Sequence, residues 1–228
     1  MQWRTISRLG MALAGLSACA QAGPSTPKQR DIILVGDSTV SSTTGWGDAF
    51  CQSMVAKVKS CANLARAGRS SRSFRKEGSW KAVLQKIKDD GASHALVLIQ
   101  FGHNDAGKDE KRRTDPDADF TDIISQYVDD VRSLNAEPIL ITPVARRIYV
   151  DGKIRDGLEP YAGAVRRIAA AKRTSLIDLH TMSVVALEKM SPAEARGLGP
   201  EGAQPDINHL GPKGARYFAD MVIRQLRL

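Results

Sequence analysis

Two residues near the end of the chain have the types and the spacing of an acid–base pair. Asp206 and His209 stand three positions apart in the stretch DINH, and His209 is the last of only four histidines. Side chains at this spacing can meet across one turn of chain, and a carboxylate that orients an imidazole prepares it to take a proton from a nucleophile. The alternative is a solvated acid and a histidine close to a helix start. The choice depends on what stands upstream.

A candidate nucleophile stands near the start of the chain. Ser38 follows the apolar run DIILVG in the stretch VGDST, and a serine on a tight turn between a strand and a helix can be exposed to substrate. Taken alone, Ser38 or Thr39 could equally cap a helix. The G-x-S-x-G motif of ordinary α/β-hydrolases does not occur in the chain.

Two further positions could bind the oxyanion that forms when a serine attacks an ester. Gly68, in NLARAGRSS, offers a backbone N–H that a ligand can approach closely, and Asn104, in FGHND, offers a side-chain amide. Each also has a simpler interpretation, because Gly68 could be a turn glycine and Asn104 a loop asparagine bonded to its own backbone.

The elements that must position these residues alternate along the chain. Apolar runs predict strands at 31–36, 61–68, 94–102, 137–144 and 174–180, and helical spacing predicts helices at 45–60, 79–91, 119–136, 159–173 and 211–228. Five strands separated by helices predict one α/β domain over 31–228, a three-layer α/β/α sandwich around a five-stranded parallel sheet. Ligands bind beyond the carboxyl ends of such strands, where all four candidate segments fall.

The ordered blocks VGDST, ARAGRSS, FGHND and DINH resemble the SGNH (GDSL-like) hydrolases, over nearly all of residues 31–228. The resemblance implies a flavodoxin-like fold, Ser38 as nucleophile, and Asp206 and His209 as its acid and base. It also implies an oxyanion hole made by Ser38, Gly68 and Asn104.

Within the family, the extended blocks look like those of rhamnogalacturonan acetylesterases, which implies removal of acetyl groups from pectin or a similar plant cell-wall polysaccharide. The stretch DINHLGPKGA departs from these relatives around the histidine, which puts substrate contacts at that rim in doubt. A lipase, thioesterase or lysophospholipase acting on longer acyl esters remains an alternative. A non-catalytic carbohydrate- or nucleotide-binding α/β module is the other.

The chain has a net charge of +8, but its basic residues are scattered among acids without an aromatic-rich basic motif, so we expect no nucleic-acid partner. Guanidinium groups suit the carboxylates of galacturonate. Arg69, Arg72, Arg146 and Arg147 are therefore candidate substrate-binding residues, with solvated loop charges as the alternative. No cluster has metal-ligand spacing and no phosphate-binding loop occurs, so we expect no metal or cofactor.

The first residues predict export. Residues 1–20 carry Arg4 and Arg8 before a short apolar run, which is typical of a secretory signal. The stretch LSAC resembles a bacterial lipobox with Cys19 as the lipidated residue, and cleavage after Ala20 is the alternative. Residues 21–30 predict a flexible tether. We expect a monomer that is either secreted or held in the periplasm or outer membrane, with contact to a membrane only through that lipid.

Export leaves two cysteines in an oxidising compartment. Cys51 and Cys61 could then form a disulfide that joins a helix to the following strand, with two buried free thiols as the alternative.

Overall fold

The computed structural model describes Met1 and residues 30–91, 95–202 and 204–226. The predicted signal segment, Cys19 and nearly all of the predicted tether lie outside these residues. In the domain, five parallel strands pair in the order β2-β1-β3-β4-β7, which confirms the predicted sheet. Their bounds are β1 Asp31–Gly36, β2 Ser60–Asn63, β3 Ala95–Gln100, β4 Glu137–Ile141 and β7 Ser175–Ile177.

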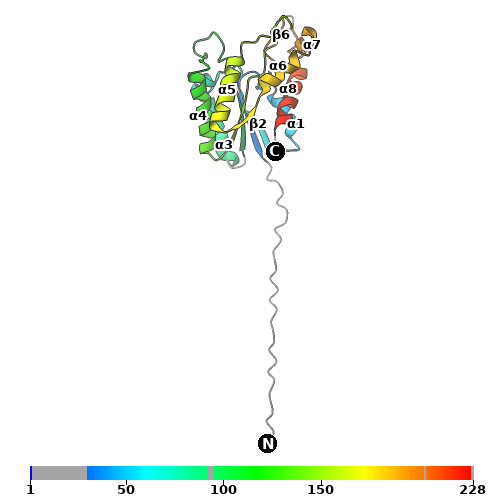
Figure 1. The fold of residues 1–228 in the computed structure, drawn as a ribbon. Helices are drawn as coiled ribbons and strands as arrows, with labels where there is room; N and C mark the ends of the chain where they lie inside the picture. The colour runs from blue at the N-terminus through cyan, green and yellow to red at the C-terminus, as the bar shows by residue number, and fades with distance from the viewer. Residues whose placement is uncertain (2–29, 92–94, 203, 227–228) are drawn as a thin grey trace.

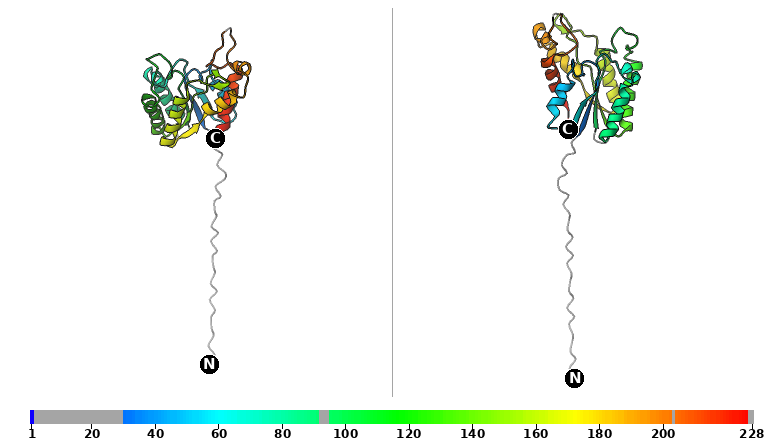
Figure 2. Two further views of the ribbon diagram at one scale, coloured as in Figure 1. Left: turned by 45° about the horizontal axis from the view of Figure 1, so that its top comes forward. Right: turned by 180° about the vertical axis from the view of Figure 1, so that it is seen from behind.

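Helices cover both faces of this sheet (Figures 1 and 2). One layer holds α1 Gly47–Met54, α6 Leu179–Leu187 and α8 Pro212–Gln225, and the other holds α2 Ser71–Lys76, α3 Ser79–Asp90, α4 Asp119–Ser133 and α5 Glu159–Lys172. Because successive strand residues face opposite sides, Ile32 and Leu34 of β1 pack into the first layer while Ile33 and Val35 pack into the second. Two buried faces explain why β1 and β3 are apolar except for Asp31 at the start of β1 and Gln100 at the end of β3.

The strand order creates a switch point between β1 and β3. The chain runs from β1 outward to β2 and then crosses to β3 on the other side of β1. The connections that leave the carboxyl ends of β1 and β3 therefore diverge, and the crevice between them is where ligands bind in sheets of this kind. Ser38 lies two residues beyond β1 and Asn104 four residues beyond β3.

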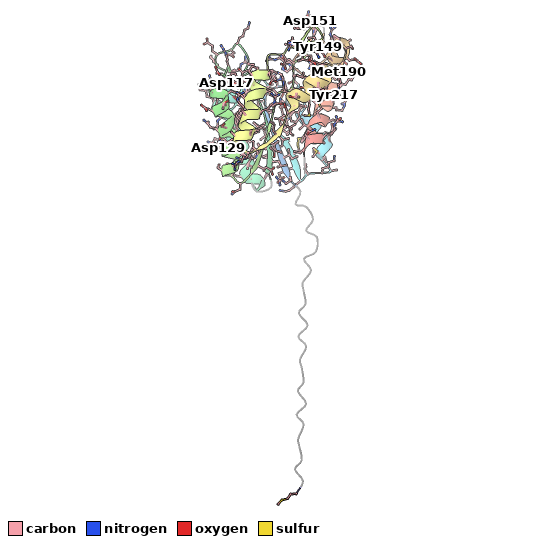
Figure 3. The ribbon with its side chains drawn as sticks, in the orientation of Figure 1. Asp117, Asp129, Tyr149, Asp151, Met190 and Tyr217 are labelled. Atoms are coloured by element: carbon pink, nitrogen blue, oxygen red, sulfur yellow. A yellow bond between two sulfur atoms is a disulfide. The ribbon has the colours of Figure 1, made fainter. Side chains whose placement is uncertain are left out.

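Several segments predicted as loops contain short elements. Helix α2 follows Gly68, a two-stranded antiparallel hairpin is formed by β5 Tyr149–Val150 and β6 Lys153–Ile154, and α7 Pro192–Arg196 precedes the Asp206 segment. The predicted fifth strand is too long, because β7 ends at Ile177 and Asp178 caps α6 through a hydrogen bond from the Thr181 N–H. Figure 3 labels Tyr149 and Asp151 on the hairpin, at the end of the molecule where the loops gather.

A disulfide joins Cys51 of α1 to Cys61 of β2, with the Cα atoms 5.3 Å apart, which confirms the predicted pairing. It ties the edge strand of the sheet to a helix of the first layer. Closing a loop of this length in the unfolded chain stabilises the fold by about 3 kcal/mol.

Candidate active site

Ser38 lies on a tight turn that its neighbours hold together. The buried Asp37 carboxylate accepts hydrogen bonds from the Thr39 N–H (2.9 Å) and the Thr39 hydroxyl (2.7 Å). The Asp37 carbonyl accepts the Val40 and Ser41 N–H groups. The next helix begins only at Gly47, so neither Ser38 nor Thr39 caps a helix. Asp37 thus braces the turn that presents the Ser38 hydroxyl.

This turn is also fixed against the end of β3. The Gln100 side chain donates to the Thr39 hydroxyl (2.7 Å) and accepts from the Trp46 indole (3.1 Å), and all three side chains are buried. A Cβ atom at Gly36 would lie 2.6 Å from the Gln100 carbonyl oxygen, so only glycine allows the strands to approach here. The nucleophile therefore stands on a rigid base.

His209 connects Asp206 to Ser38, the three residues predicted to form the catalytic set. Its Nδ1 lies 2.7 Å from Asp206 Oδ2, and its Nε2 lies 3.0 Å from Ser38 Oγ. With the Nδ1 proton on the Asp206 side, Nε2 can accept the hydroxyl proton of Ser38. The side chains of His209 and Asp206 remain about one third exposed, so substrate and water can reach them.

Asp206 is organised to stay ionised. Partial burial raises the pKa of its carboxyl. The hydrogen bonds donated by the His209 and Asn208 N–H groups and by the imidazole outweigh this effect, and the pKa lies below its ordinary value. A carboxylate at this place orients the imidazole and stabilises the imidazolium that forms during the reaction.

Arg147 is placed differently from the predicted substrate-binding role. Its side chain is buried, and its Nη2 donates to the backbone carbonyls of Asp206 and His209, the latter at 2.6 Å. The Arg147 N–H also donates to the Ile207 carbonyl (2.9 Å). Arg147 thus holds both ends of the turn that carries the acid and the base, and its burial lowers the pKa of the guanidinium.

Arg146 also points into the protein rather than toward the rim. Its guanidinium donates to the His103 carbonyl (3.0 Å) and the Asp156 carbonyl (3.0 Å), while its N–H donates to the Asp156 carboxylate. Because His103 precedes Asn104, this contact fixes the backbone beside a predicted oxyanion donor. The sequence does not predict these contacts, because adjacent residues in an irregular segment show no periodicity that indicates which side chains turn inward.

The predicted oxyanion donors follow β1, β2 and β3, whose carboxyl ends share one edge of the parallel sheet. Gly68 has φ = +76°, a left-handed conformation that favours glycine. Among the described residues, neither the Ser38 N–H nor the Gly68 N–H donates to an acceptor. The Asn104 amide donates one hydrogen to the Arg69 carbonyl (3.1 Å), which leaves its second hydrogen for a ligand. Three donors are therefore available at this crevice.

Arg69 and Arg72 lie closer to solvent than the other two predicted arginines. Arg69 Nε contacts Glu77 at 2.8 Å, and Arg72 forms an ion pair with Asp119. About one third of each arginine side chain is exposed. Their role in substrate binding stays a prediction.

Two residues of the loop after β3 hold this loop against neighbouring segments. Asp105 is buried, where its carboxylate accepts the Ser71 N–H at the start of α2, the Ser71 hydroxyl (2.5 Å) and the Thr114 hydroxyl (3.0 Å). Burial raises its pKa to about 6, against the lowering effect of these bonds. Asp105 thus joins the Asn104 loop to α2. Arg112 lies against Gly68 and Asn104; its stretch KDEKRRTD reads only as a mixed-charge loop.

Within residues 30–91, 95–202 and 204–226, no group of three or more potential ligands could hold a metal ion. The helices of the described part of the chain are too short or too polar to cross a membrane.

A serine, an imidazole and a carboxylate in one hydrogen-bonded line at the switch point of an α/β/α sheet form the arrangement of a serine hydrolase. Comparison with known proteins agrees with this class. The sequence pattern of the family described as GDSL-like Lipase/Acylhydrolase matches residues 32–222.

Two Bacillus subtilis relatives align over 86% of this chain. One, named "Probable rhamnogalacturonan acetylesterase YesY", is 33% identical over 205 residues and 92% of its own length. The other, named "Rhamnogalacturonan acetylesterase RhgT", is 31% identical over 214 residues and 88% of its length. The crystal structure of YxiM, also from Bacillus subtilis, superposes with a TM-score of 0.74 at 27% identity, over 87% of this chain and 56% of that one.

The chain therefore belongs to the GDSL-like lipase/acylhydrolase family, and it is a carboxylic ester hydrolase.

Proposed function

We propose that this protein is an exported acetylesterase that removes acetyl groups from a plant cell-wall polysaccharide of the rhamnogalacturonan or pectin type. The observation that carries the proposal is the hydrogen-bonded line from Ser38 through His209 to Asp206. Three available N–H donors stand at the same edge of the sheet. The printed names of the two Bacillus subtilis relatives support the acetyl group and the polysaccharide.

The mechanism follows from the positions of these groups. Ser38 Oγ attacks the acetyl carbonyl while His209 Nε2 takes the hydroxyl proton, and the Asp206 carboxylate stabilises the resulting imidazolium. The Ser38 N–H, the Gly68 N–H and the free hydrogen of the Asn104 amide hold the oxyanion. His209 then protonates the departing sugar hydroxyl. It next removes a proton from the water that cleaves the acetyl-enzyme, which returns Ser38 and releases acetate.

The surface beside the residues that follow His209 offers polar groups that a sugar could contact. A cavity of about 470 Å³ adjoins the residues that follow His209. Polar and apolar groups both contribute to its wall. The polar ones come from Ser42, Thr43, Asp48, Gln52 and Arg216, and the apolar ones from Ala49, Cys51, Leu210, Pro212 and Ala215. Hydroxyls, amides and charged groups can hydrogen-bond to sugar hydroxyls, whereas an acyl chain of eight or more carbons needs an apolar wall.

Acetate release from acetylated pectins, xylans and mannans tests the substrate, with p-nitrophenyl acetate and p-nitrophenyl octanoate as the measure of acyl length. We expect release from acetylated pectin and a clear preference for acetyl over octanoyl ester. Ser38→Ala should lower turnover at least roughly 1,000-fold; Ser133→Ala, at the exposed end of α4, is the matched control. A preference for octanoate would support the lipase alternative, and the absence of fluorophosphonate labelling at Ser38 would support a non-catalytic module.

We also infer that the chain is exported through residues 1–20, with Cys19 as a lipid-bearing residue, residues 21–30 as a tether and residues 31–228 as a monomeric hydrolase domain. The disulfide between Cys51 and Cys61 supports an oxidising compartment. Palmitate labelling of the wild type and of Cys19→Ser, followed by cell fractionation, tests the anchor. Loss of label and release of the protein in Cys19→Ser would support it, and an unlabelled wild type would refute it.

A further inference from the structure

Arg112, in the loop between β3 and α4, touches both segments that supply the proposed oxyanion donors. Its Nη1 lies 3.1 Å from the Gly68 carbonyl oxygen and 3.4 Å from Asn104 Oδ1. Gly68 and Asn104 come from separate connections, after β2 and β3 respectively. One guanidinium therefore bridges two pieces of chain that no shared helix or strand holds in register.

The contacts of the Asn104 side chain fix the orientation of its amide. Its Oδ1 faces Arg112, and its Nδ2 donates to the carbonyl of Arg69, the residue after Gly68. The guanidinium is a donor only, so Arg112 selects the amide rotamer in which the oxygen faces it. In that rotamer the NH₂ group faces the Gly68 segment, and its second hydrogen is free for the oxyanion.

Arg112 is itself held in place. Its Nε donates to Asp109 Oδ2 (2.8 Å), and its N–H donates to the Asp109 carbonyl (3.0 Å). The side chain is 39% exposed, so it stands at the edge of the crevice and keeps a positive charge next to the amide. A fixed cation beside a donor polarises that donor toward the negative charge of the transition state.

We propose that Arg112 is a positioning residue of the oxyanion hole, which fixes the Asn104 amide and the Gly68 turn relative to Ser38. The inference rests on the proposed esterase function. It assigns to a loop arginine a contribution to turnover on any acetyl ester, including one that carries no sugar.

Hydrolysis of p-nitrophenyl acetate by Arg112→Gln and Arg112→Lys tests the proposal, with Arg113→Gln as the control. Arg113 is the exposed neighbour in the same loop, and its substitution removes the same charge. We expect kcat to fall roughly 10- to 100-fold in Arg112→Gln with KM within about twofold, since a misplaced donor weakens the transition state and not the ground state. Arg112→Lys should recover part of this loss, and Arg113→Gln should match the wild type.

A double-mutant cycle with Asn104→Ala shows whether Arg112 acts through Asn104. Asn104→Ala alone should lower kcat by roughly 100- to 1,000-fold. Adding Arg112→Gln should then change kcat by less than about threefold, because the group that Arg112 positions is gone. If Arg112→Gln fails to fold, Arg112→Lys and Asp109→Asn replace it in the cycle, with a smaller fall in kcat expected for both.

Three results would overturn the proposal. The first is wild-type kcat for the Arg112 variants on p-nitrophenyl acetate. The second is a defect confined to acetylated oligosaccharides, which would make Arg112 a substrate ligand. The third is full additivity with Asn104→Ala. In each case the wild type remains an active esterase that Ser38→Ala inactivates, so these failures are distinct from failure of the proposed function, in which the wild type releases no acetate.

Discussion

The described part of the chain contains two histidine–aspartate pairs, and only one of them has the surroundings of a catalytic pair. His209 Nδ1 lies 2.7 Å from Asp206, and His180 Nε2 lies 3.1 Å from Asp156. The side chains of the first pair are about one third exposed, whereas those of the second pair are 5% exposed. The same two residue types at similar distances thus occupy very different environments.

The group that faces the other ring nitrogen of each imidazole explains the difference. The second nitrogen of His209 faces the Ser38 hydroxyl, while the second nitrogen of His180 lies 3.2 Å from a Glu159 carboxylate oxygen. An imidazole between two carboxylates has no nitrogen free to accept a hydroxyl proton. Asp156 also accepts the backbone N–H groups of Arg146 and Leu158. The buried pair therefore braces the loop that carries Arg146, and the more exposed pair is the one that we propose for proton transfer.

Replacing each histidine by alanine should give the largest contrast. We expect His209→Ala to lower kcat on p-nitrophenyl acetate by roughly 10,000-fold or more with little change in Tm, because it removes the general base from a half-exposed site. His180→Ala should retain kcat within about tenfold and lose about 3 kcal/mol of stability, since Asp156 is left buried without its partner. Steady-state kinetics and urea unfolding measure both. Equal losses of kcat would break the distinction.

Replacing each aspartate by asparagine tests the same contrast from the acid side. Asp206→Asn should lower kcat by roughly 1,000- to 10,000-fold, because the amide no longer holds the imidazole tautomer that accepts from Ser38. Asp156→Asn should instead lower the free energy of unfolding by about 2–3 kcal/mol. Circular dichroism of the folded variants is the control. A stable but inactive Asp156→Asn would place the buried pair in the reaction.

The backbone support of the catalytic pair can be removed without touching its side chains. Arg147→Met keeps much of the buried volume but loses the hydrogen bonds to the carbonyls of Asp206 and His209. We expect kcat to fall roughly 10- to 100-fold, since small displacements of catalytic groups are costly. Arg72→Met, at the surface, should leave p-nitrophenyl acetate hydrolysis unchanged. If both variants behave alike, the turn does not depend on Arg147.

The pH dependence of stability should separate carboxylates with and without an imidazole partner. Burial raises the pKa of Asp156, but the bonds from His180, Leu158 and Arg146 lower it more, so it lies below its ordinary value. The Asp156 carboxylate therefore stabilises the fold fully above pH 3.8, which is the pKa of this group in the unfolded chain. This contribution is lost as the pH falls through the lower pKa of the folded state. The deficit of Asp156→Asn relative to the wild type should shrink below pH 3.8 in urea titrations.

Asp105 should show the opposite sign. Its folded pKa of about 6 lies above the unfolded value of 3.8, so the folded state takes up a proton first as the pH falls. The wild type should gain about 1 kcal/mol from this group between pH 7 and pH 5. The deficit of Asp105→Asn should therefore grow over the same interval. A constant deficit would mean that Asp105 is ionised throughout.

The parts of the fold that repeat a strong local pattern could be predicted from the sequence. Strands β1 and β3 are apolar through their central residues because both faces are buried. Ser38, Asp206 and His209 stand in short blocks with recognisable neighbours. Helix α7 and the β5–β6 hairpin could not be predicted, because elements of two to five residues show no full period. The inward direction of Arg147 and the contacts of Arg112 depend on which loops pack against each other. The spacing of residues within one loop does not predict that packing.

Both ends of the described domain lie at the same pole. Arg30 precedes β1 and forms an ion pair with Glu137 at the start of β4, while Leu226 follows α8 and lines a cavity with the same Glu137. Ser38 lies beyond the other end of β1, roughly 20 Å away along six strand residues. A fusion partner, a solid support or a lipid joined at either terminus would therefore leave the crevice open to substrate. The domain is suited to being displayed on a surface or linked in series with carbohydrate-binding modules.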